Sequence, residues 1–508
     1  MSHPAVPSPL KIPIFRNVWW ATLISNFGGL IQSVGAAWLM LEMTRQADMV
    51  ALVQTSTALP IALFSLLGGA IADGLDRRRV MLAAQLFMLL VSAALALCAW
   101  LELLSPWLLL GFTFLLGCGA ALNAPAWQAS VQDMVSRPQV SAAVGLNSMG
   151  FNLARSTGPA IGGAIVAFAG AAVAFAINAL SYLGLIAVLW RWRPTPEPRL
   201  LPRERLASAM AAGLRYVRLS PAIRVVLLRS AIFGLGASAA PALLPLVAER
   251  LGSGSALVYG VLLGAFGLGA VVAALASTRL RERMATESIV RLSSAGCALA
   301  LAIAAYSSLF VVTALAVFAA GVGWVLALST FNVTVQLSAP RWVVARVLAL
   351  YQMAAFAGLA GGSWLWGWLA RSSGLDSALI GAAAALLISA LVGWLLPLAP
   401  AADRDLDPLR QYREPETAVP VQPRTGPVVI TVEWIIDEED IVPFLHAMAE
   451  RRRIRRRDGA HRWALLRDLH EPRTWIERFK CATWLDYLRH NSRVTKDDAA
   501  IFERLRAL

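Results

Sequence analysis

Two long apolar runs of the chain are separated by the stretch Gly69-Ala-Ile-Ala-Asp73-Gly-Leu-Asp76-Arg77-Arg78-Arg79. It sets two carboxylates beside three consecutive arginines in a tight turn. A carboxylate in such a turn can pair with arginine and with the free amides at a helix end. We expect Gly69, Asp73, Asp76, Arg77 and Arg78 to form a switch that locks one packing of the surrounding helices and releases it in another. The plainer alternative is a basic loop that only sets membrane topology.

The composition around this stretch is that of a membrane protein. Hydrophobic residues make up 58% of the 508 residues and charged residues 15%, whereas an average soluble domain is roughly 45–50% apolar. These values exclude a disordered chain, a disulfide-rich secreted scaffold and a collagen-like fibre. An integral membrane protein is the class that remains.

The net charge of +14 belongs almost entirely to the hydrophobic part of the chain. Residues 1–400 carry 25 basic and 12 acidic side chains, a balance of +13, and residues 401–508 carry 20 and 19, a balance of +1. Membrane proteins collect Lys and Arg in their cytoplasmic loops, whereas a nucleic-acid-binding protein presents a folded basic face. We therefore expect no nucleic-acid partner.

Twelve apolar stretches are long enough to cross a bilayer, for which roughly 20 mostly apolar residues are needed. They lie at residues 19–41, 49–72, 80–103, 107–126, 141–168 and 172–190, and again at 223–247, 256–278, 288–307, 309–332, 346–370 and 377–397. Basic residues dominate every even-numbered connection and no odd-numbered one. The positive-inside rule then places both termini in the cytoplasm, with membrane lipids around the spans.

The two groups of six stretches match each other at a constant offset of 204 residues. The offset pairs Ala72, Arg77 and Arg79 with Ala276, Arg281 and Arg283, pairs Gln132, Arg137, Val140, Leu146 and Met149 with Gln336, Arg341, Val344, Leu350 and Met353, and pairs Gly163 with Gly367. This pattern predicts a parallel repeat of six-helix halves. In such repeats the substrate site lies near the middle of the membrane between the halves.

These patterns divide the chain into six parts. They are a cytoplasmic N-terminus (1–18), a six-helix N-terminal bundle (19–190), a cytoplasmic linker with an amphipathic helix (191–222), a six-helix C-terminal bundle (223–397), a second linker (398–427) and a cytoplasmic α+β domain (428–508).

Polar side chains inside the apolar stretches are candidates for the wall of the substrate site. They are Asn26, Gln32, Asn123, Asn152, Arg155, Arg229, Asn332 and Gln336. A charge at mid-membrane costs at least about 2.5–3.5 kcal/mol, so Arg155 should face the interior or a wet cavity. It either attracts an anionic substrate or ties its helix to carbonyl groups of a neighbour, and the residues alone favour neither interpretation. Each other candidate, taken singly, is more often an interhelical hydrogen-bonding group than a ligand contact.

The fifth stretch contains Gly158-Pro159-Ala-Ile-Gly162-Gly163. Glycines at this spacing let helix backbones approach closely, and packed membrane helices tolerate the bend that proline introduces. Close packing is sufficient to explain these four residues.

The sequence shows no pattern for catalysis or metal binding. No Asp or Glu lies in the middle of an apolar stretch, and the four cysteines lack metal-ligand spacing. No phosphate-binding loop of the Gly-x-x-x-x-Gly-Lys-Ser/Thr type occurs. We expect no catalytic residue, no metal and no cofactor.

The motifs together resemble those of the major facilitator superfamily. Residues 69–79 resemble its G-x-L-A-D-R-x-G-R-K/R signature, although Gly74 replaces the usual Arg and Asp76 the usual Gly. Residues 158–163 resemble the G-P-x-x-G-G motif of the superfamily's exporters. With the Asn123-Ala-Pro-Ala-Trp127 turn and the run at 457–460, they resemble the transmembrane secretion effectors, the subfamily that contains the enterobactin exporters. The tail resembles the ferredoxin-like domain of antibiotic-biosynthesis monooxygenases.

The resemblance implies an all-α membrane fold of twelve transmembrane helices in two six-helix repeats, plus a small ferredoxin-like α+β domain. It implies a secondary transporter of the bacterial inner membrane that exports a small siderophore-like or other amphipathic molecule by alternating access. It also implies that Asn26, Gln32, Asn123 and Asn332 face the cavity, and that the tail supports a homodimer. Proton antiport is implied too, although the sequence supplies no obvious proton carrier.

Two alternative functions stay open at this point. One is the movement of lysophospholipids or other lipids. The other, from a different class, is a membrane-anchored enzyme or sensor that acts through the C-terminal domain.

Overall fold

The computed structural model describes residues 8–136, 139–193, 206–253, 255–340, 342–398, 406, 409 and 417–507. The chain forms two compact units. The first comprises Met1–Leu206, Val225–Val333 and Ala349–Leu398, and the second comprises Ala207–Arg224, Thr334–Leu348 and Ala399–Leu508. The expected N-terminus at 1–18 and the expected linkers at 191–222 and 398–427 lie partly outside the described residues.

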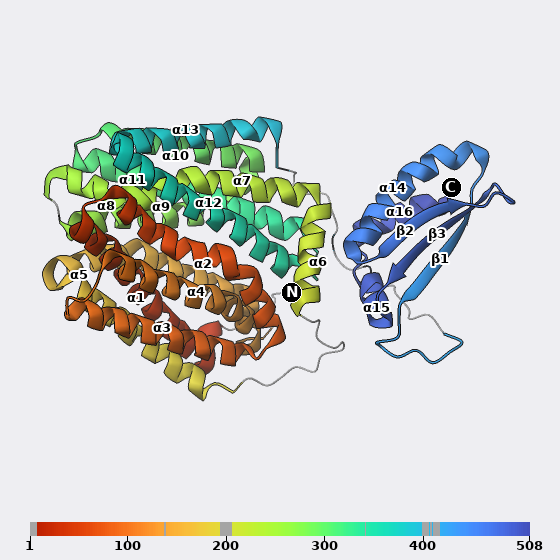
Figure 1. The fold of residues 1–508 in the computed structure, drawn as a ribbon, viewed down its shortest axis with the longest axis horizontal. Helices are drawn as coiled ribbons and strands as arrows, with labels where there is room; N and C mark the ends of the chain where they lie inside the picture. Colours follow the sequence, from red (N-terminus) through yellow and green to blue (C-terminus); the bar gives the residue numbers. More distant parts are fainter. Residues whose placement is uncertain are drawn as a thin grey trace, which may run out of the picture. The chain divides into compact units, whose positions relative to one another are not determined.

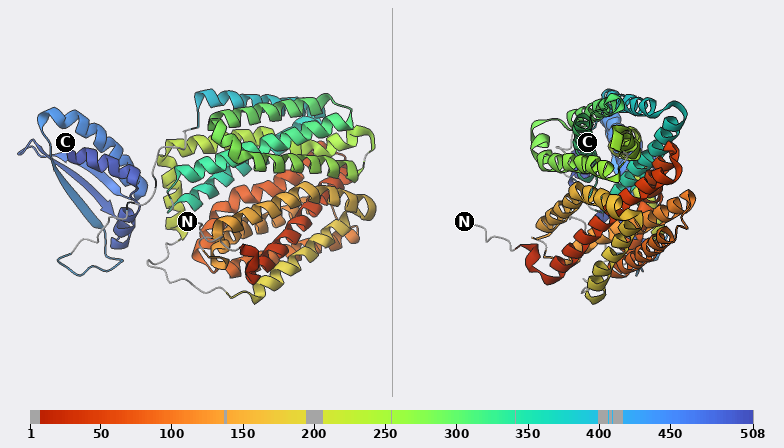
Figure 2. Two further views of the ribbon diagram at one scale, coloured as in Figure 1. Left: turned by 180° about the vertical axis from the view of Figure 1, so that it is seen from behind. Right: turned by 90° about the vertical axis from the view of Figure 1, so that its left-hand side faces the viewer.

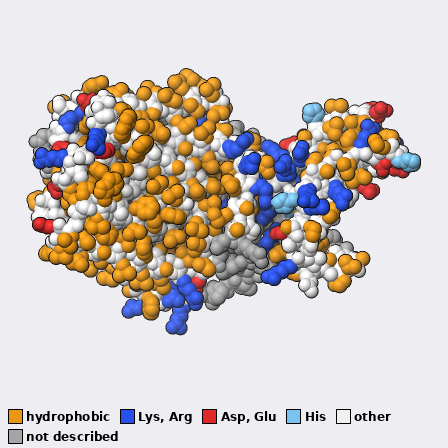
Figure 3. Space-filling view, viewed as in Figure 1, with side chains coloured by type: hydrophobic (Ala, Val, Ile, Leu, Met, Phe, Trp, Pro, Cys, Tyr) orange, Lys and Arg blue, Asp and Glu red, His pale blue; other side chains and the backbone are white. Residues whose placement is uncertain are grey.

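The first unit is a bundle of long helices (Figure 1). They are α1 (Pro13–Thr44), α2 (Ala47–Gly74), α3 (Arg77–Trp100), α4 (Pro106–Met134), α5 (Val140–Arg191), α7 (Pro221–Ala237), α8 (Ala239–Ala248), α9 (Ala256–Arg283), α10 (Thr286–Tyr306), α11 (Phe310–Ser338), α12 (Val344–Ser373) and α13 (Leu375–Leu395), with the short turns η1 (Pro9–Lys11) and η3 (Glu249–Ser253). Within the described residues, 11 helical segments are long and apolar enough to cross a membrane. Hydrophobic side chains cover most of the face of this unit that Figure 3 shows. The chain is therefore a mostly helical membrane protein.

Helix α5 is interrupted at Gly170. This glycine has a φ of +82°, a value that a residue without a side chain adopts readily. A continuous helix of its 52 residues would be about 78 Å long, far more than the roughly 30 Å of hydrocarbon in a bilayer. Helix α5 therefore consists of two helical segments, 140–169 and 171–191, although it counts as one candidate span.

Side-chain caps determine where two of the helices begin. The carboxylate of Asp76 accepts hydrogen bonds from the backbone amides of Arg78, at 2.9 Å, and Arg79, at 3.4 Å. The hydroxyl of Ser105 accepts one from the amide of Leu108 at 3.2 Å. Each cap satisfies amides that the first turn of a helix leaves free. Asp76 of the charged turn is thus the residue that starts α3.

Helices from the two sequence repeats pack closely at glycines. A Cβ atom on Gly163 of α5 would lie 2.7 Å from the backbone oxygen of Ala256 and 2.8 Å from the Cα of Gly260, both in α9. A Cβ atom on Gly367 of α12 would lie 2.4 Å from the Cβ of Ala51 in α2. Because Gly163 and Gly367 are the pair related by the 204-residue offset, the same kind of contact occurs once in each repeat.

The second unit contains α6 (Leu206–Leu219), residues 334–348 and an α+β tail. The tail consists of β1 (Val428–Ile435), η4 (Glu438–Asp440), α14 (Ile441–Asp458), β2 (His461–Arg467), β3 (Thr474–Cys481), α15 (Trp484–Ser492) and α16 (Lys496–Ala507). Its three antiparallel strands lie in the order β1-β3-β2. The expectation of an α+β tail is confirmed.

One face of this sheet is covered by α14 and α16 (Figure 2). Trp434 and Trp475 point to that face and pack around Phe444, which is fully buried. Residues of β1 alternate between half-buried and exposed, which leaves Val429 and Ile435 on the opposite, uncovered face.

Within the second unit, the tail contacts α6 and the segment that joins α11 to α12. The guanidinium of Arg457 lies over the ring of Tyr216, 5.3 Å from its centroid. The guanidinium of Arg493 lies over the ring of Trp342 at 4.2 Å. These two rings pack edge to face at 5.7 Å. These cation–π contacts link the α+β tail to α6 and to the segment before α12, which lie more than 100 residues earlier in the sequence.

Candidate substrate cavity

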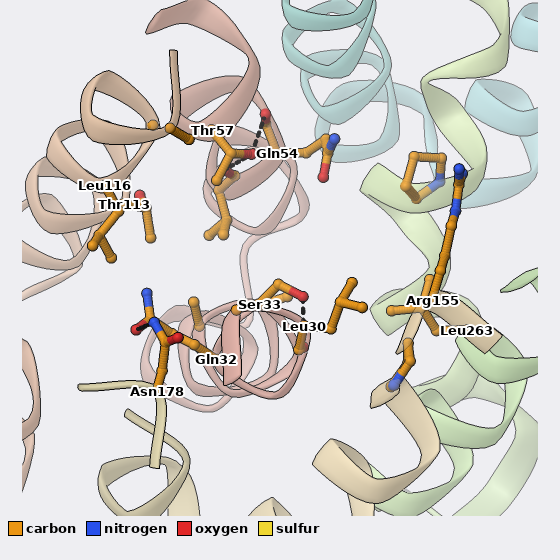
Figure 4. A pocket seen from close by; sticks show the side chains of 18 of the residues that line it. Leu30, Gln32, Ser33, Gln54, Thr57, Thr113, Leu116, Arg155, Asn178 and Leu263 are labelled. Atoms are coloured by element: carbon orange, nitrogen blue, oxygen red, sulfur yellow. Dashed lines mark hydrogen bonds between the residues drawn. The ribbon is translucent and has the colours of Figure 1, made fainter. Parts of the chain in front are cut away.

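A cavity of about 410 Å³ lies inside the first unit (Figure 4). Its lining residues come from α1 to α5 on the N-terminal side of the repeat and from α8, α9 and α11 on the C-terminal side. Its volume falls within the roughly 300–1,000 Å³ typical of small-molecule sites. The cavity therefore lies between helices of the two sequence repeats and has the size of a small-molecule site.

An uncharged hydrogen-bond network forms one side of the cavity. The side-chain oxygen of Gln32 accepts hydrogen bonds from the hydroxyl of Ser92, at 2.7 Å, and from the amide nitrogen of Asn178, at 2.6 Å. The same nitrogen donates to the hydroxyl of Tyr182 at 3.2 Å. These bonds hold α1, α3 and α5 together and fix the polar atoms of this wall.

The opposite side carries a cation and aromatic rings. In Figure 4, Arg155 and Leu263 lie across the cavity from Thr113 and Asn178. The guanidinium carbon of Arg155 lies 5.6 Å from the ring centroid of Phe266. Phe266 in turn packs edge to face against Trp324 at 5.7 Å. Arg155 is the one charged side chain among the described residues that line the cavity.

Helices of the two repeats also contact each other beside the cavity. Trp38 of α1 stacks on Tyr259 of α9, with 6.3 Å between the ring centroids. Arg371, near the end of α12, forms an ion pair of 2.7 Å with Asp48, near the start of α2. Both contacts connect helices that precede residue 191 with helices that follow residue 221.

Two of the eight predicted cavity residues line this cavity, namely Gln32 and Arg155. The described lining does not include the other six, which are Asn26 in α1, Asn123 in α4, Asn152 in α5, Arg229 in α7, and Asn332 and Gln336 in α11. Gln336 is exposed and belongs to the second unit. The side-chain oxygen of Asn123 is buried and has no hydrogen-bond partner among the described residues.

Arg229 has a structural partner that the sequence pattern did not reveal. It is fully buried and forms an ion pair of 2.8 Å with Glu287 of α10. It also donates to the backbone oxygen of Leu396 at 3.1 Å, while Glu287 accepts a bond from the amide of Leu398 at 3.0 Å. The pair thus fastens α7, α10 and the end of α13 to one another.

The charged turn holds helices of the N-terminal repeat together. Arg77 forms an ion pair of 3.0 Å with Asp133 of α4. Arg78 donates to the backbone oxygens of Leu189, at 2.8 Å, and Trp190, at 2.6 Å, at the end of α5. The side chain of Asp73 lies outside the described residues.

At Gly69, by contrast, the turn region approaches the other repeat. A Cβ atom placed on Gly69 would lie 3.9 Å from the Cβ of Ala349 in α12, which is ordinary van der Waals contact. The arginines of the turn thus contact their own repeat, and Gly69 lies near the other with room for a methyl group between them.

The Gly158–Gly163 motif packs on two helices at once. A Cβ atom on Gly158 would lie 3.2 Å from the Cβ of Leu30, and one on Gly162 would lie 3.0 Å from the Cα of Ile31, both in α1. Gly163 faces α9 as described above, and Pro159 lines the cavity. The motif brings α5 close to α1 and α9 and places Pro159 in the wall of the cavity.

Sequence reasoning missed several polar residues of the cavity, among them Asn178, Tyr182, Thr57 and Thr113. Asn178 lies in the middle of an apolar stretch, so the signal that singled out Asn26 applies to it equally. Threonine hydroxyls carry no such signal, because in helices they commonly bond the preceding turn, as that of Thr57 does to Gln54 at 2.9 Å.

A comparison with known protein families decides the assignment. The sequence profile of the family described as transmembrane secretion effector, within the major facilitator superfamily, matches residues 5–508. The chain belongs to this family. Members of the family are transporters, so this transmembrane secretion effector is a transporter and not an enzyme.

Individual relatives agree with this assignment. The staphyloferrin A transporter of Staphylococcus aureus (strain NCTC 8325 / PS 47) is 25% identical over 272 residues, covering 53% of this chain and 67% of the relative. The enterobactin exporter EntS of Escherichia coli O1:K1 is 27% identical over 346 residues, covering 67% of this chain and 81% of the relative.

A solved structure is similar in fold. A bacterial homolog of the human lysosomal transporter Spinster, inward-facing and unoccupied, superimposes with a TM-score of 0.60 at 16% sequence identity. The match covers 76% of this chain and 97% of that one. This similarity shows a major facilitator fold, and the family match together with the 11 candidate spans among the described residues shows a multi-pass membrane protein.

Proposed function

We propose that this transmembrane secretion effector exports a small, siderophore-like amphipathic molecule, which it holds in the cavity between its two repeats. The observation that carries the proposal is the cavity of about 410 Å³, bounded by helices of both repeats and lined by a cation, amides and aromatic rings. A substrate site near the middle of the membrane between repeats is the arrangement of alternating-access transporters. The relatives named for staphyloferrin A and enterobactin support a siderophore-like cargo.

The proposal includes a fold of twelve spans. The two segments of α5 on either side of Gly170 supply the extra span beyond the 11 counted. The N-terminal six-helix half then covers 19–190 and the C-terminal half 223–397, and the two close contacts at Gly163 and Gly367 support this division. Both termini lie in the cytoplasm and the protein lies in the bacterial inner membrane, as the basic even-numbered connections and the bacterial relatives favour.

The residues proposed to bind cargo are Gln32 and Arg155, because both line the cavity. The charged turn at 69–79 and the glycines at 158–163 serve the change of packing between halves. The approach of Gly69 to α12 and the close packing of Gly163 on α9 support this role.

We assign the tail a ferredoxin-like fold that pairs two copies of the chain. The strand order β1-β3-β2 with helices on one face matches three strands of that fold. The uncovered face carries Val429, Ile435 and Leu466, each more than 40% exposed. Burying such a face against a second copy would remove apolar surface from water.

Export is tested by cargo accumulation in inside-out membrane vesicles that contain the full chain. Labelled enterobactin, staphyloferrin A and a lysophospholipid are offered in turn, with proton or sodium gradients and with ionophores. We expect accumulation of a siderophore that collapses with the gradient. Accumulation of the lysophospholipid alone would favour lipid transport, and no accumulation of any compound under any gradient would contradict export.

A matched pair of variants connects transport to the cavity. Thr57→Trp puts an indole into the cavity and should abolish accumulation. Leu90→Trp places the same ring on α3, where the side chain is 69% exposed, and should leave accumulation close to that of the parent chain. Equal transport by the two variants would show that the cargo takes another route.

A further inference from the structure

Arg155 is half-buried and, among the described residues, has no carboxylate partner, unlike the buried arginines Arg229 and Arg451. Arg229 is paired with Glu287, and Arg451 of the tail is paired with Glu477 at 2.7 Å. Among the described residues, Arg155 forms no ion pair or hydrogen bond, and its charge meets the face of Phe266. A cation inside an apolar bundle is costly unless water or an opposite charge compensates it. The open side of Arg155 faces the cavity, so compensation must come from what fills the cavity.

The backbone around Arg155 is held in place by the close packing of two helices. A Cβ atom on Gly267 of α9 would lie 2.1 Å from the backbone oxygen of Arg155, and one on Gly264 would lie 3.3 Å from the backbone oxygen of Ser156. No side chain other than hydrogen fits at Gly267. Arg155 therefore lies where helices of the two repeats touch. A movement of one repeat relative to the other would shift its guanidinium group.

The surroundings of Arg155 are aromatic. Phe266 and Trp324 form an edge-to-face pair next to it, and Tyr259 also lines the cavity. The far side presents the amide groups of Gln32 and Asn178, which already bond each other. The cavity thus offers one cation, a flat apolar surface beside it and uncharged polar atoms opposite.

We infer that the cavity selects molecules with an anionic group, which pairs with the guanidinium of Arg155, joined to a flat apolar body, which packs on Phe266 and Trp324. This inference deepens the proposed function and rests on it for the statement that such molecules are cargo. Arginine forms two parallel hydrogen bonds to carboxylates and similar anions, and these are among the stronger polar contacts in proteins. A neutral molecule of the same shape leaves the cation unpaired, and a cationic one is repelled by it.

Binding to the purified full chain in detergent tests this inference without any transport step. The probes are naphthoate, naphthamide and naphthylmethylamine, which share one flat body and differ in charge. Binding is measured by quenching of tryptophan fluorescence and by the shift in melting temperature. We expect naphthoate to bind at least about tenfold more tightly than naphthamide, with naphthylmethylamine weakest.

Variants of Arg155 show where the preference originates. Arg155→Gln should weaken naphthoate binding at least about tenfold and change naphthamide binding little, while Arg155→Lys should keep most of the preference. Arg291→Gln is the matched control, since Arg291 of α10 lies over Trp394 at 4.3 Å and is not among the cavity residues. It should change the binding of neither probe.

Several results would overturn the inference. They are equal binding of the three probes to the parent chain, equal loss of naphthoate and naphthamide in Arg155→Gln, and no naphthoate binding up to about 1 mM. The comparison of probes on the parent chain decides the matter even if Arg155→Gln does not fold. Charge-selective binding in a chain that exports nothing would contradict the proposed function and leave this inference standing.

Discussion

At the scale of single residues, this protein compensates its buried charges in two ways. Arg229 and Arg451 each face a carboxylate, so removing either partner would leave the other charge buried and unpaired, which typically costs about 3–5 kcal/mol. Arg155 instead faces a cavity. The first arrangement stabilises a fixed packing, and the second leaves a charge available to a molecule that enters and leaves.

Two buried groups in the tail should make its stability depend on pH in opposite directions. Burial, followed by the positive charge of Arg455, holds the pKa of His490 well below its usual range. Burial raises the pKa of Asp458 to about 6, although the neighbouring Arg457 opposes this shift. The stability that neutral His490 contributes is present above about pH 6.5 and is lost as the pH falls. The stability from protonated Asp458 is fully present below about pH 3.9 and is lost as the pH rises through 6.

We therefore predict that the free energy of unfolding of the tail decreases as the pH is lowered and then becomes constant. It should decrease by at most about 0.4 kcal/mol per pH unit between about pH 7 and pH 5.5, roughly 0.7 kcal/mol in all, and level off below about pH 5, where the two groups cancel. In Asp458→Asn the decrease should continue. Amide hydrogen exchange of tail peptides in the full chain, corrected for intrinsic exchange rates, measures both curves. Identical curves for the parent chain and the variant would disprove the role of Asp458.

At the scale of elements, close helix crossings depend on residues without side chains. Gly163 and Gly260 let α5 and α9 touch through their backbones, and Gly367 does the same for α12 and α2. Without a hydrophobic driving force in lipid, such backbone contact is a main source of helix association. The bundle should therefore be sensitive to a single methyl group at these crossings and insensitive at glycines that have open space around them.

Gly163→Ala should destabilise the bundle, because the added methyl group would lie within 2.8 Å of α9. Overpacking of this kind typically costs about 1–3 kcal/mol. Gly184→Ala is the control on the same helix, since nothing lies within 4 Å of its Cβ position. Thermal unfolding in one detergent should show a lower melting temperature for Gly163→Ala alone. A drop of equal size in both variants would point to the loss of glycine itself.

At the scale of the whole bundle, two side-chain contacts join the repeats at one end of the first unit. The ion pair of Asp48 with Arg371 and the stack of Trp38 on Tyr259 connect helices of opposite repeats. Alternating access requires such contacts to break when the cavity opens on that side. Both lie at the end where α1 and α12 finish and where α2 and α9 begin, the extracytoplasmic end in the orientation that we propose.

Breaking the Asp48–Arg371 pair should raise access to the cavity from the extracytoplasmic side. A partly exposed pair contributes up to about 1 kcal/mol, so Arg371→Ala should increase access up to about fivefold. Access is measured as the rate at which an impermeant maleimide labels Ser33→Cys, a cavity position, in a chain whose four native cysteines are replaced.

Two further variants test whether the pair acts between the repeats. The exchange Asp48→Arg with Arg371→Asp should return the labelling rate to that of the parent chain. Arg250→Ala breaks the ion pair with Asp376 inside one repeat and should leave the rate unchanged. A faster rate in Arg250→Ala would show that any lost charge loosens this end.

Periodic patterns in the sequence predict much of this architecture. The long apolar stretches predicted the helices, and the constant 204-residue offset predicted the repeat. Gln32 and Arg155 were also accessible to this reasoning, because a polar group in an apolar span is conspicuous in the sequence.

Packing between distant segments decides which residues line the cavity and which partners the buried polar groups have. Glu287 lies 58 residues from Arg229, and Asn178 meets Gln32 across 146 residues. Neither pairing leaves a trace in spacing, because the helix faces that meet are chosen by how all the helices fit together. The sequence therefore does not show which polar residue joins two helices and which lines the cavity. A polar side chain is stable in either place when a hydrogen-bonding or charged partner is present.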